Sequence, residues 1–275
     1  MKRILTAVIV LPFLIASILI SSLWWLFVLL AAAAMILGLF EFYVLAKKLQ
    51  LKPEPVVGYV AGAAVFTLSL KPDPLGNALL TQLIIIALTI VTLVVATFRG
   101  APFDKMLASV GATILSVLYI PMLGCYLVAV RVGFEPSLSA HLLSFYFLVL
   151  MGGDAGAYYV GRSFGKRKLA PSISPGKTWE GAIGGMVAAL AMATLAHFWF
   201  FRDLPLKYAL PLAAIMTIIG ILGDLAESAL KRGAGAKDAA NILPGHGGIL
   251  DRLDSLLFNA PLLYYFGVAF FQRIL

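Results

Sequence analysis

Long apolar segments separated by short polar breaks run through the whole chain. Segments of about 20 apolar residues, at a helical rise of about 1.5 Å per residue, are long enough to cross about 30 Å of hydrocarbon. They lack the alternating pattern of an outer-membrane barrel, so their backbone hydrogen bonds must be satisfied within helices. The sequence predicts an all-α, polytopic membrane protein. We expect about nine transmembrane helices, at residues 4–21, 23–46, 56–70, 79–98, 106–130, 138–160, 181–201, 208–230 and 255–272.

The breaks between these segments carry turn-forming residues, among them a Gly-, Pro- and Ser-rich stretch from residue 161 to 176. The first apolar run follows Met1-Lys2-Arg3, as in a signal peptide, but no small-residue cleavage site precedes Trp24-Trp25. We therefore interpret it as a retained helix. Gly181, Gly184 and Gly185 have the spacing that permits close packing between membrane helices.

Composition and charge agree with a membrane protein. Of 275 residues, 61% are hydrophobic and 12% charged, against about 25% charged in a soluble domain. The single cysteine, Cys125, lies in an apolar run and allows no disulfide within one chain. The net charge of +8 is typical of a basic rim beside anionic lipid headgroups, so nucleic acid is not required as a partner.

The basic residues also predict an orientation. If the N-terminus lies inside, sixteen of the 21 basic residues fall on the cytoplasmic side and five on the other. The positive-inside rule therefore favours an N-in, C-out arrangement. The five outside are Lys71, Arg131, Arg202, Lys207 and Arg273.

Polar residues are distributed unevenly along the chain. We divide it into an N-terminal scaffold of three helices (residues 1–76), a middle pair of helices (77–135) and a C-terminal catalytic region of four helices with cytoplasmic loops (136–275). Glu41 is the clearest polar residue within the early spans. It could pair with Lys47 or Lys48, or it could face an internal cavity.

Two features of the C-terminal region precede the seventh predicted helix. Asp154 is flanked by glycines at a depth where a charge needs a partner, which leaves a structural ion pair and a polar cavity as equal alternatives. Ser174, Lys177 and Thr178 stand just before a helix start, whose free N–H groups suit phosphate. The spacing is not that of a Walker motif, and Thr178 and Glu180 also fit a role in starting the helix.

The densest group of ionisable residues extends from Asp224 to Asp254. Asp224 and Ser228 share a helical face, as do Asp251 and Asp254 if the last helix begins near Gly248. Three converging carboxylates disfavour one another's ionisation unless a cation lies between them. Mg²⁺ fits, because it takes carboxylate, phosphate and water oxygens. We expect Asp224 and Asp251 to hold it, and Asp254 to hold a second cation, for which a monovalent ion is one candidate, or to orient the first ligands.

Basic residues at the same rim supply charge for substrate phosphates. We expect this of Lys177, Lys231, Lys237 and Arg252, together with His246, for which a proton-donor role is the alternative. Gly247 and Gly248 would let the backbone approach a ligand closely. For Arg232, a role at the site and a role as an ordinary basic residue of the cytoplasmic side are equal alternatives.

These residues resemble the signature of the phosphatidate cytidylyltransferase family, bacterial type. The chain has Ser228-x-x-Lys231-Arg232, four residues, Lys237-Asp238, and then His246-Gly247-Gly248-x-x-Asp251-Arg252-x-Asp254. Ser174-Pro175-x-Lys177-Thr178-x-Glu180-Gly181 and the segment around Asp154 and Tyr158 also resemble the family. The likeness covers about the last 125 residues in motif form, whereas the first half matches only as apolar spans.

The resemblance implies a nucleotidyltransferase that makes CDP-diacylglycerol and pyrophosphate from CTP and phosphatidic acid with Mg²⁺, at the head of phospholipid biosynthesis. It also implies a homodimer, surrounded by membrane lipid in the bacterial cytoplasmic (inner) membrane, with its active site on the cytoplasmic side. On this basis we expect catalytic roles for Asp224, Asp251, Asp254, Lys177 and His246. The substrate-binding set that we expect is Asp154, Ser174, Lys177, Thr178, Ser228, Lys231, Lys237 and Arg252.

Two other functions stay open at this point. A CTP-dependent polyprenol or phytol kinase would release CDP rather than pyrophosphate. A secondary transporter would use Asp154 and the glycine-broken sixth span as a midplane site, although the carboxylates cluster at one rim and no repeated halves are visible. A CDP-alcohol phosphotransferase is excluded, because its Asp-x-x-Asp-Gly-x-x-Ala-Arg pattern is absent.

Overall fold

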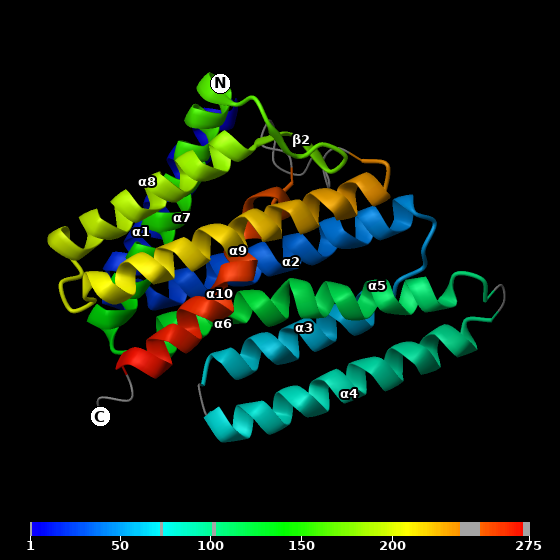
Figure 1. The fold of residues 1–275 in the computed structure, drawn as a ribbon. Coiled ribbons are helices and arrows are strands. Elements are labelled where there is room, and N and C mark those ends of the chain that lie inside the picture. The colour runs from blue at the N-terminus through cyan, green and yellow to red at the C-terminus, as the bar shows by residue number, and fades with distance from the viewer. Residues whose placement is uncertain (1, 72–73, 101–102, 237–247, 272–275) are drawn as a thin grey trace.

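The computed structural model describes residues 2–71, 74–100, 103–236 and 248–271 (Figure 1). These residues are mostly helical, as predicted. The elements are, in chain order, α1 (Lys2–Leu19), the 3₁₀ helix η1 (Ser21–Leu23), α2 (Trp24–Lys48), α3 (Pro55–Ser69), α4 (Pro74–Phe98), α5 (Met106–Tyr119), α6 (Pro121–Gly133), α7 (Pro136–Phe164), β1 (Lys168–Ala170), β2 (Ser174–Thr178), α8 (Trp179–Trp199), α9 (Leu206–Gly233) and α10 (Leu250–Phe271).

Each predicted span corresponds to a helical segment. Seven segments among the described residues are long and apolar enough to cross a membrane, with α5 and α6 together forming one of them. The multi-pass, all-α architecture is confirmed, while the total of nine spans and the N-in, C-out orientation stay predictions. The last helix begins at Leu250 rather than at 255, because its charged first turn lies outside the apolar run on which the prediction was based.

The helices form a continuous bundle with the candidate catalytic elements at one side. In Figure 1, α4 lies at one edge against α3 and α5, and α8 packs at the other side against α7 and α9. Between these edges, α10 packs against both α9 and α6. The N-terminal helices therefore connect to the C-terminal region through α10 and α6.

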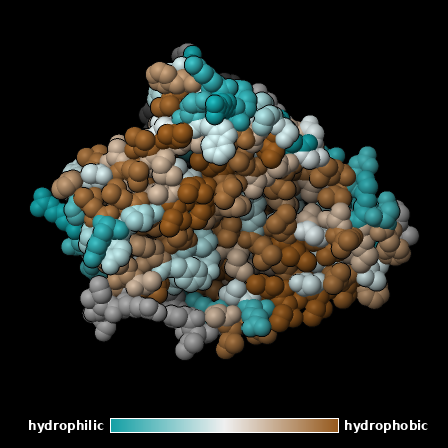
Figure 2. All heavy atoms as spheres, viewed as in Figure 1, coloured by the Kyte–Doolittle hydropathy of each residue, from teal (hydrophilic) through white to brown (hydrophobic). Residues whose placement is uncertain are grey.

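Apolar side chains cover much of the outer surface. Large exposed residues include Leu79 on α4, Leu107 on α5 and Ile183 on α8. Figure 2 shows this apolar surface across the middle of one face, with hydrophilic groups gathered towards its margins. Such a surface is favourable in contact with lipid, where the bilayer replaces water as the solvent.

Arg131, at the end of α6, is not the loop residue that the count of basic residues outside the membrane assumed. It is buried, and its guanidinium donates to the carbonyl oxygens of Ser17 at 3.0 Å and Ile20 at 3.2 Å. The last carbonyls of a helix lack partners within the helix. Arg131 therefore joins α6 to the end of α1, and it does not belong to the loop charges with which the sequence count grouped it.

The predicted loop from residue 161 to 176 is partly ordered as regular structure. Helix α7 continues to Phe164, and β1 and β2 then pair antiparallel, with Lys168 opposite Thr178 and Ala170 opposite Ser174. Strands this short leave no periodic pattern in a sequence. The hairpin matters because β2 carries Ser174 and Lys177.

The contact between α7 and α8 depends on glycine, as expected from Gly181, Gly184 and Gly185. An added Cβ at Gly156 would press on the Cβ of Ala188 and lie 2.9 Å from the carbonyl oxygen of Gly184. An added Cβ at Gly185 would lie 3.0 Å from the carbonyl oxygen of Gly153. The absence of side chains thus brings the two backbones together.

We expect Gly156→Ala to destabilise the bundle by about 1–3 kcal/mol, because the extra methyl group overpacks this contact. Gly111→Ala is the matched control, since it is the same substitution in a helix at an exposed position with no neighbouring atom within 4 Å of the new Cβ. It should leave stability unchanged or slightly raised. Thermal unfolding in detergent measures both variants, and equal midpoints would contradict the packing argument.

Candidate active site

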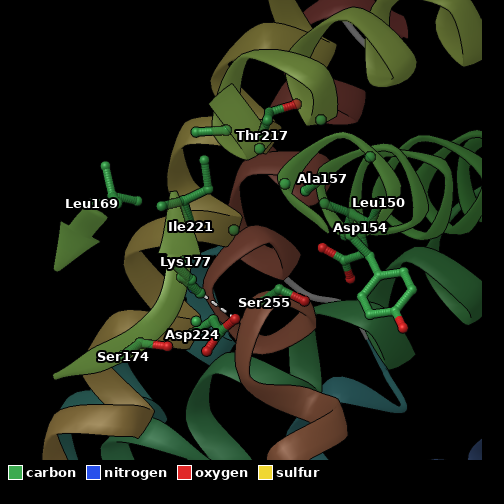
Figure 3. A pocket seen from close by; sticks show the side chains of 18 of the residues that line it. Leu150, Asp154, Ala157, Leu169, Ser174, Lys177, Thr217, Ile221, Asp224 and Ser255 are labelled. Atoms are coloured by element: carbon green, nitrogen blue, oxygen red, sulfur yellow. Dashed lines mark ion pairs between the residues drawn. The ribbon is translucent and has the colours of Figure 1, made fainter. Parts of the chain in front are cut away.

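A cavity of about 630 Å³ lies between α7, α8, α9, α10 and the hairpin. Its apolar wall comes from residues such as Val149, Leu150 and Ile221. Figure 3 shows side chains from these separate elements arranged around it. The charged and hydroxyl-bearing residues in its lining are Asp154, Tyr158, Arg162, Ser174, Lys177, Thr178, Thr217, Asp224, Asp251, Arg252, Asp254 and Ser255.

Carboxylates from three helices line this cavity. Asp154 comes from α7, Asp224 from α9 and Asp254 from α10. The carboxylate of Asp254 is 8% exposed and interacts electrostatically with those of Asp224 and Asp154. Of the two alternatives for Asp154, the structure therefore supports the one in which it lines a polar cavity.

Lys177 connects the hairpin to the aspartate cluster. Its Nζ lies 2.6 Å from Oδ2 of Asp224, and Oγ of Ser228 donates to Oδ1 of the same aspartate at 3.3 Å. The predicted shared face of Asp224 and Ser228 is thus confirmed. Residues from two separate sequence motifs are brought into one site.

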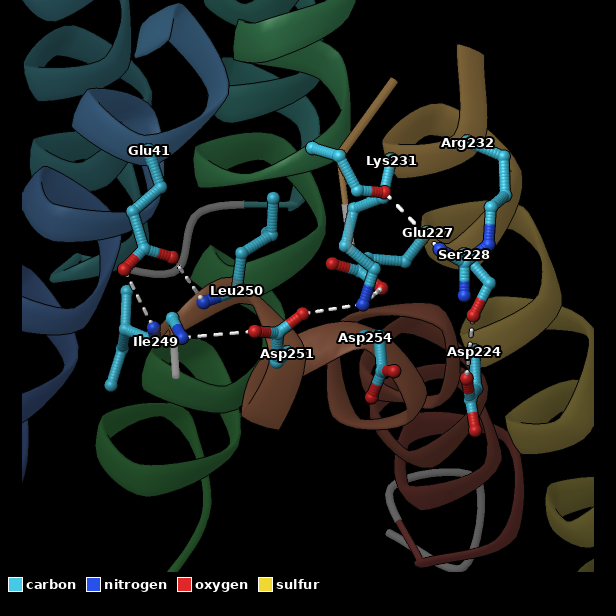
Figure 4. A network of polar contacts seen from close by, with 12 residues as sticks. Glu41, Asp224, Glu227, Ser228, Lys231, Arg232, Ile249, Leu250, Asp251 and Asp254 are labelled. Carbon is cyan, nitrogen blue, oxygen red and sulfur yellow. Dashed lines mark hydrogen bonds and ion pairs between the residues drawn. The ribbon is translucent and has the colours of Figure 1, made fainter. Parts of the chain in front are cut away.

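Asp251 belongs to a second group of charged residues, with Lys231 and Glu227, which lies beside the group formed by Lys177 and Asp224. Its Oδ1 lies 2.5 Å from Nζ of Lys231, and the backbone N–H of Gly248 donates to its Oδ2 at 2.9 Å (Figure 4). Lys231 also lies 2.5 Å from Oε2 of Glu227. The lysine is therefore held between carboxylates of two helices.

Glu227 was not selected by sequence reasoning. It is fully buried on α9, four residues before Lys231. A carboxylate inside an apolar span, with a lysine one helical turn later, is a signal that could have identified it. Its carboxyl group contacts the same lysine that contacts Asp251.

Glu41 of α2 reaches the same region from the N-terminal half. Its carboxylate accepts from the backbone N–H groups of Ile249 and Leu250, both at 2.8 Å (Figure 4). The suggested pairing with Lys47 or Lys48 is wrong. An added Cβ at Gly248 would lie 2.5 Å from Oε2 of Glu41, so the close approach expected there is made by this carboxylate.

At the start of α8, Thr178 and Glu180 have the helix-starting role that the sequence left open as one alternative. Thr178 is the N-cap and accepts from the N–H of Gly181 at 3.1 Å. Glu180 accepts from the N–H groups of Lys166 at 3.0 Å and Arg167 at 3.2 Å. Thr178 also lines the cavity, so its role toward a substrate stays a prediction.

The remaining predicted residues fall into two groups. Ser174 and Arg252 line the cavity, as expected for substrate-binding residues. Lys237 and His246 lie outside the described residues, together with Asp238 and Gly247.

The carboxylates offer the oxygen ligands that Mg²⁺ prefers. Within the described part of the chain, however, no three His, Cys, Asp or Glu side chains converge closely enough to hold a metal by themselves. The ammonium groups of Lys177 and Lys231 lie against Asp224 and Asp251, which shows that these carboxylates attract positive charge. The donor set fits Mg²⁺ with further ligands from water and phosphate, and the assignment stays a prediction.

The fold and the cavity define the class of protein: it is a multi-pass, all-α membrane protein with a charged cavity between its last four helices. Compared with sequence families, residues 1–270 match the Cytidylyltransferase family. The chain belongs to this family. The match covers both halves of the chain, including the helices that sequence motifs alone did not connect to it.

Similar proteins carry one shared name. The chain is 44% identical over 185 residues to the phosphatidate cytidylyltransferase of Bacillus subtilis (strain 168), covering 66% of this chain and 64% of that protein. It is 45% identical over 136 residues to the phosphatidate cytidylyltransferase of Haemophilus influenzae, covering 48% and 47%. A relative of that name from Brucella suis is 49% identical over 127 residues, 46% of each chain. The alignments thus span between about half and two thirds of the relatives' own length.

If Lys177 holds a substrate phosphate, as the sequence predicts, Lys177→Met should lower activity by about 10- to 100-fold, because a charged hydrogen bond contributes about 1.5–3 kcal/mol. Lys168→Met, the same change at an exposed residue of β1, should cost less than about fivefold, since exposed charges contribute up to about 1 kcal/mol. Turnover measured on the two purified variants provides the comparison. Equal, mild losses would show that the hairpin is only a positively charged anchor.

Proposed function

We propose that this protein is a phosphatidate cytidylyltransferase, which forms CDP-diacylglycerol and pyrophosphate from CTP and phosphatidic acid. The observation that carries the proposal is the cavity in which Lys177 and the aspartates of α7, α9 and α10 meet. Membership of the Cytidylyltransferase family supports the same reaction. The shared name of the relatives agrees with it.

The cavity has both an apolar and a charged part, as this pair of substrates requires. Its walls contain apolar residues such as Val149 and Leu150 on α7, which suit the glycerol and acyl portion of a lipid. Its charged residues, among them Lys177 and Arg252, suit phosphates. A lipid phosphate and a nucleotide triphosphate would meet where these two regions join.

The proposed chemistry is an in-line displacement at phosphorus. A phosphate oxygen of phosphatidic acid attacks the α-phosphorus of CTP with its electron pair, and the bond from that phosphorus to the bridging oxygen of the β-phosphate breaks. Pyrophosphate leaves with that electron pair. The attacking phosphate is already ionised near neutral pH, so the protein mainly positions two anions and balances the charge of the transition state.

Bound Mg²⁺ would neutralise phosphate charge in this reaction. We propose that Asp224 and Asp251 hold it, and that Asp254 either holds a second cation, for which a monovalent ion is one candidate, or orients the first ligands. Two of these carboxylates already contact ammonium groups at 2.6 Å or less, which supports their affinity for cations. Asp154 would add negative charge to the same cavity.

The basic residues would hold the two phosphate groups. Lys177, Lys231, Lys237 and Arg252 are proposed for this role, as is His246, with proton donation as its alternative. Lysine acts as a point charge in such contacts, whereas arginine forms a planar fork. Ser174, Thr178 and Ser228 would complete the polar lining as hydrogen-bonding groups.

We further propose that the protein lies in a bacterial cytoplasmic (inner) membrane, with the cavity opening on the cytoplasmic side, and acts as a homodimer among membrane lipids. The cytoplasmic side is where CTP is available. The surplus of basic residues on that side supports the orientation.

The decisive experiment follows labelled CTP with the purified protein and phosphatidic acid. Equal amounts of CDP-diacylglycerol and pyrophosphate are expected. Formation of CDP with a lipid alcohol as acceptor would instead identify a kinase. Uptake of a solute into sealed vesicles without CTP would identify a transporter.

Asp224→Asn, Asp251→Asn and Asp254→Asn should each lower turnover at least about 100-fold, or about 2.7 kcal/mol, because each removes negative charge at nearly constant shape. Asp203→Asn, at an exposed aspartate in the α8–α9 connection, is the matched control and should retain activity. Thermal unfolding checks that all four variants fold. Wild-type turnover in one of the first three would remove that residue from the metal assignment.

Cysteine labelling tests the orientation. In a Cys125→Ala background, Asp203→Cys should react with a membrane-impermeant maleimide added outside intact spheroplasts. Lys168→Cys should react only after permeabilisation, because both positions are exposed but lie at opposite ends of α8. The reverse pattern would overturn the N-in, C-out arrangement.

A further inference from the structure

Glu41 is a buried acid in the half of the chain that carries no sequence motif of the site. It belongs to α2, and its side chain has no solvent exposure. Its hydrogen bonds are to backbone N–H groups 208 and 209 residues further along the chain. Such a contact fixes two distant segments relative to each other.

The contacted segment is the start of α10. Helix α10 begins at Leu250, so the N–H groups of Ile249 and Leu250 are among those without a partner inside the helix. Each oxygen of the Glu41 carboxylate accepts one of them at 2.8 Å. A carboxylate at this end of a helix is also favoured by the helix dipole.

The fit between Glu41 and this helix start leaves no spare room. A Cβ at Gly248 would meet both oxygens and the carboxyl carbon of Glu41 within 3.1 Å. Gly248, two residues before the first residue of the helix, must therefore stay small for the carboxylate to reach the N–H groups. The same glycine donates its own N–H to Asp251 at 2.9 Å.

Asp251 is one residue beyond the second N–H group that Glu41 holds. Its carboxylate lies at the cavity and contacts Lys231 at 2.5 Å. A rotation or a shift of the first turn of α10 would move this carboxylate directly. The direction of Asp251 thus depends on the geometry that Glu41 maintains.

Glu41 also occupies a place that a substrate phosphate would otherwise suit. Free N–H groups and the positive end of a helix dipole bind anions. With the protein's own carboxylate there, substrate phosphates are left to the lysine and arginine side chains of the cavity. The backbone at this helix start is thereby used for position rather than for substrate.

We propose that Glu41 is a positioning residue, which holds the first turn of α10 so that Asp251 faces the cavity. This inference rests on the proposed function, since it assigns Glu41 a role in the same reaction. Glu41 itself does not touch a substrate.

Glu41→Gln is the sharpest variant, because it keeps the shape of the side chain. An amide has one acceptor oxygen, and its NH₂ group would face an N–H donor, so one of the two hydrogen bonds is lost. Gly248→Ala disturbs the same contact from the other side and serves if the first variant folds poorly. Glu54→Gln is the matched control. Glu54 lies at the start of α3, away from α10, and its carboxylate pairs with Arg99.

Hydrogen exchange measured by mass spectrometry reports on the hydrogen bonds between Glu41 and the start of α10, and it does not require an assay of activity. In Glu41→Gln, the peptide spanning residues 248–254 should exchange about tenfold faster, as expected for the loss of a buried hydrogen bond, while peptides from α7 and α8 keep the wild-type rate. Glu54→Gln should leave residues 248–254 unchanged. Wild-type exchange there in both Glu41→Gln and Gly248→Ala would overturn the proposal.

The second measurement is the Mg²⁺ concentration that gives half-maximal CDP-diacylglycerol formation. It should rise about tenfold in Glu41→Gln and stay constant in Glu54→Gln. A loss of folded protein lowers the maximal rate but does not change this concentration. Faster exchange with an unchanged Mg²⁺ requirement would show that Glu41 holds the helix without positioning Asp251, and the proposal would fail.

The two hypotheses can fail separately. A wild-type chain that forms no CDP-diacylglycerol from CTP and phosphatidic acid would refute the proposed function. The exchange rates of residues 248–254 would then still decide whether Glu41 holds the start of α10.

Discussion

Charged groups within membrane helices must find partners inside the protein, because a bilayer core offers them neither water nor counter-ions. This constraint explains most of the polar architecture of the C-terminal region. Asp224 is met by Lys177, and Lys231 is shared between Asp251 and Glu227. Ion pairs therefore join α9 to the hairpin and to α10 beside the cavity.

The same pairs bear on how the proposed substrates would be held. Lys177 and Lys231 are bonded to carboxylates here, and they are also the groups proposed to contact phosphates. Carboxylates of the protein and phosphates of the substrates thus compete for the same ammonium groups. The two ion pairs offset part of the cost of burying Asp224 and Asp251 before substrates arrive.

The two halves of the chain are less separate than their motifs suggest. Residues 1–135 contain few polar groups and match the family resemblance only as apolar spans, yet Glu41 and Arg131 in this half make hydrogen bonds that connect elements distant in sequence. Glu41 holds α10, and Arg131 holds the end of α1. The first half thus makes one contact to the start of a cavity helix, α10, and one contact between its own helices α1 and α6.

The amino-acid sequence by itself determined the class of structure and most of the candidate residues. Apolar segments of about 20 residues require helices in lipid, and Asp224, Lys177 and Asp254 are recognisable because charge in or beside such segments is costly. These are local properties of the chain, and the structure brings the three residues together in one cavity. The short strands of the hairpin lay beyond the same reasoning, since they have no periodic signal.

Only the tertiary structure decided which group meets which. Glu41 seemed closest to Lys47 and Lys48 along the helix, but its partners are backbone N–H groups more than 200 residues away. Glu227 gained its importance from Asp251, which contacts the same lysine from another helix. Sequence spacing reports neighbours within one helix, whereas the partner of a buried charge is set by how helices pack, and that information is not local.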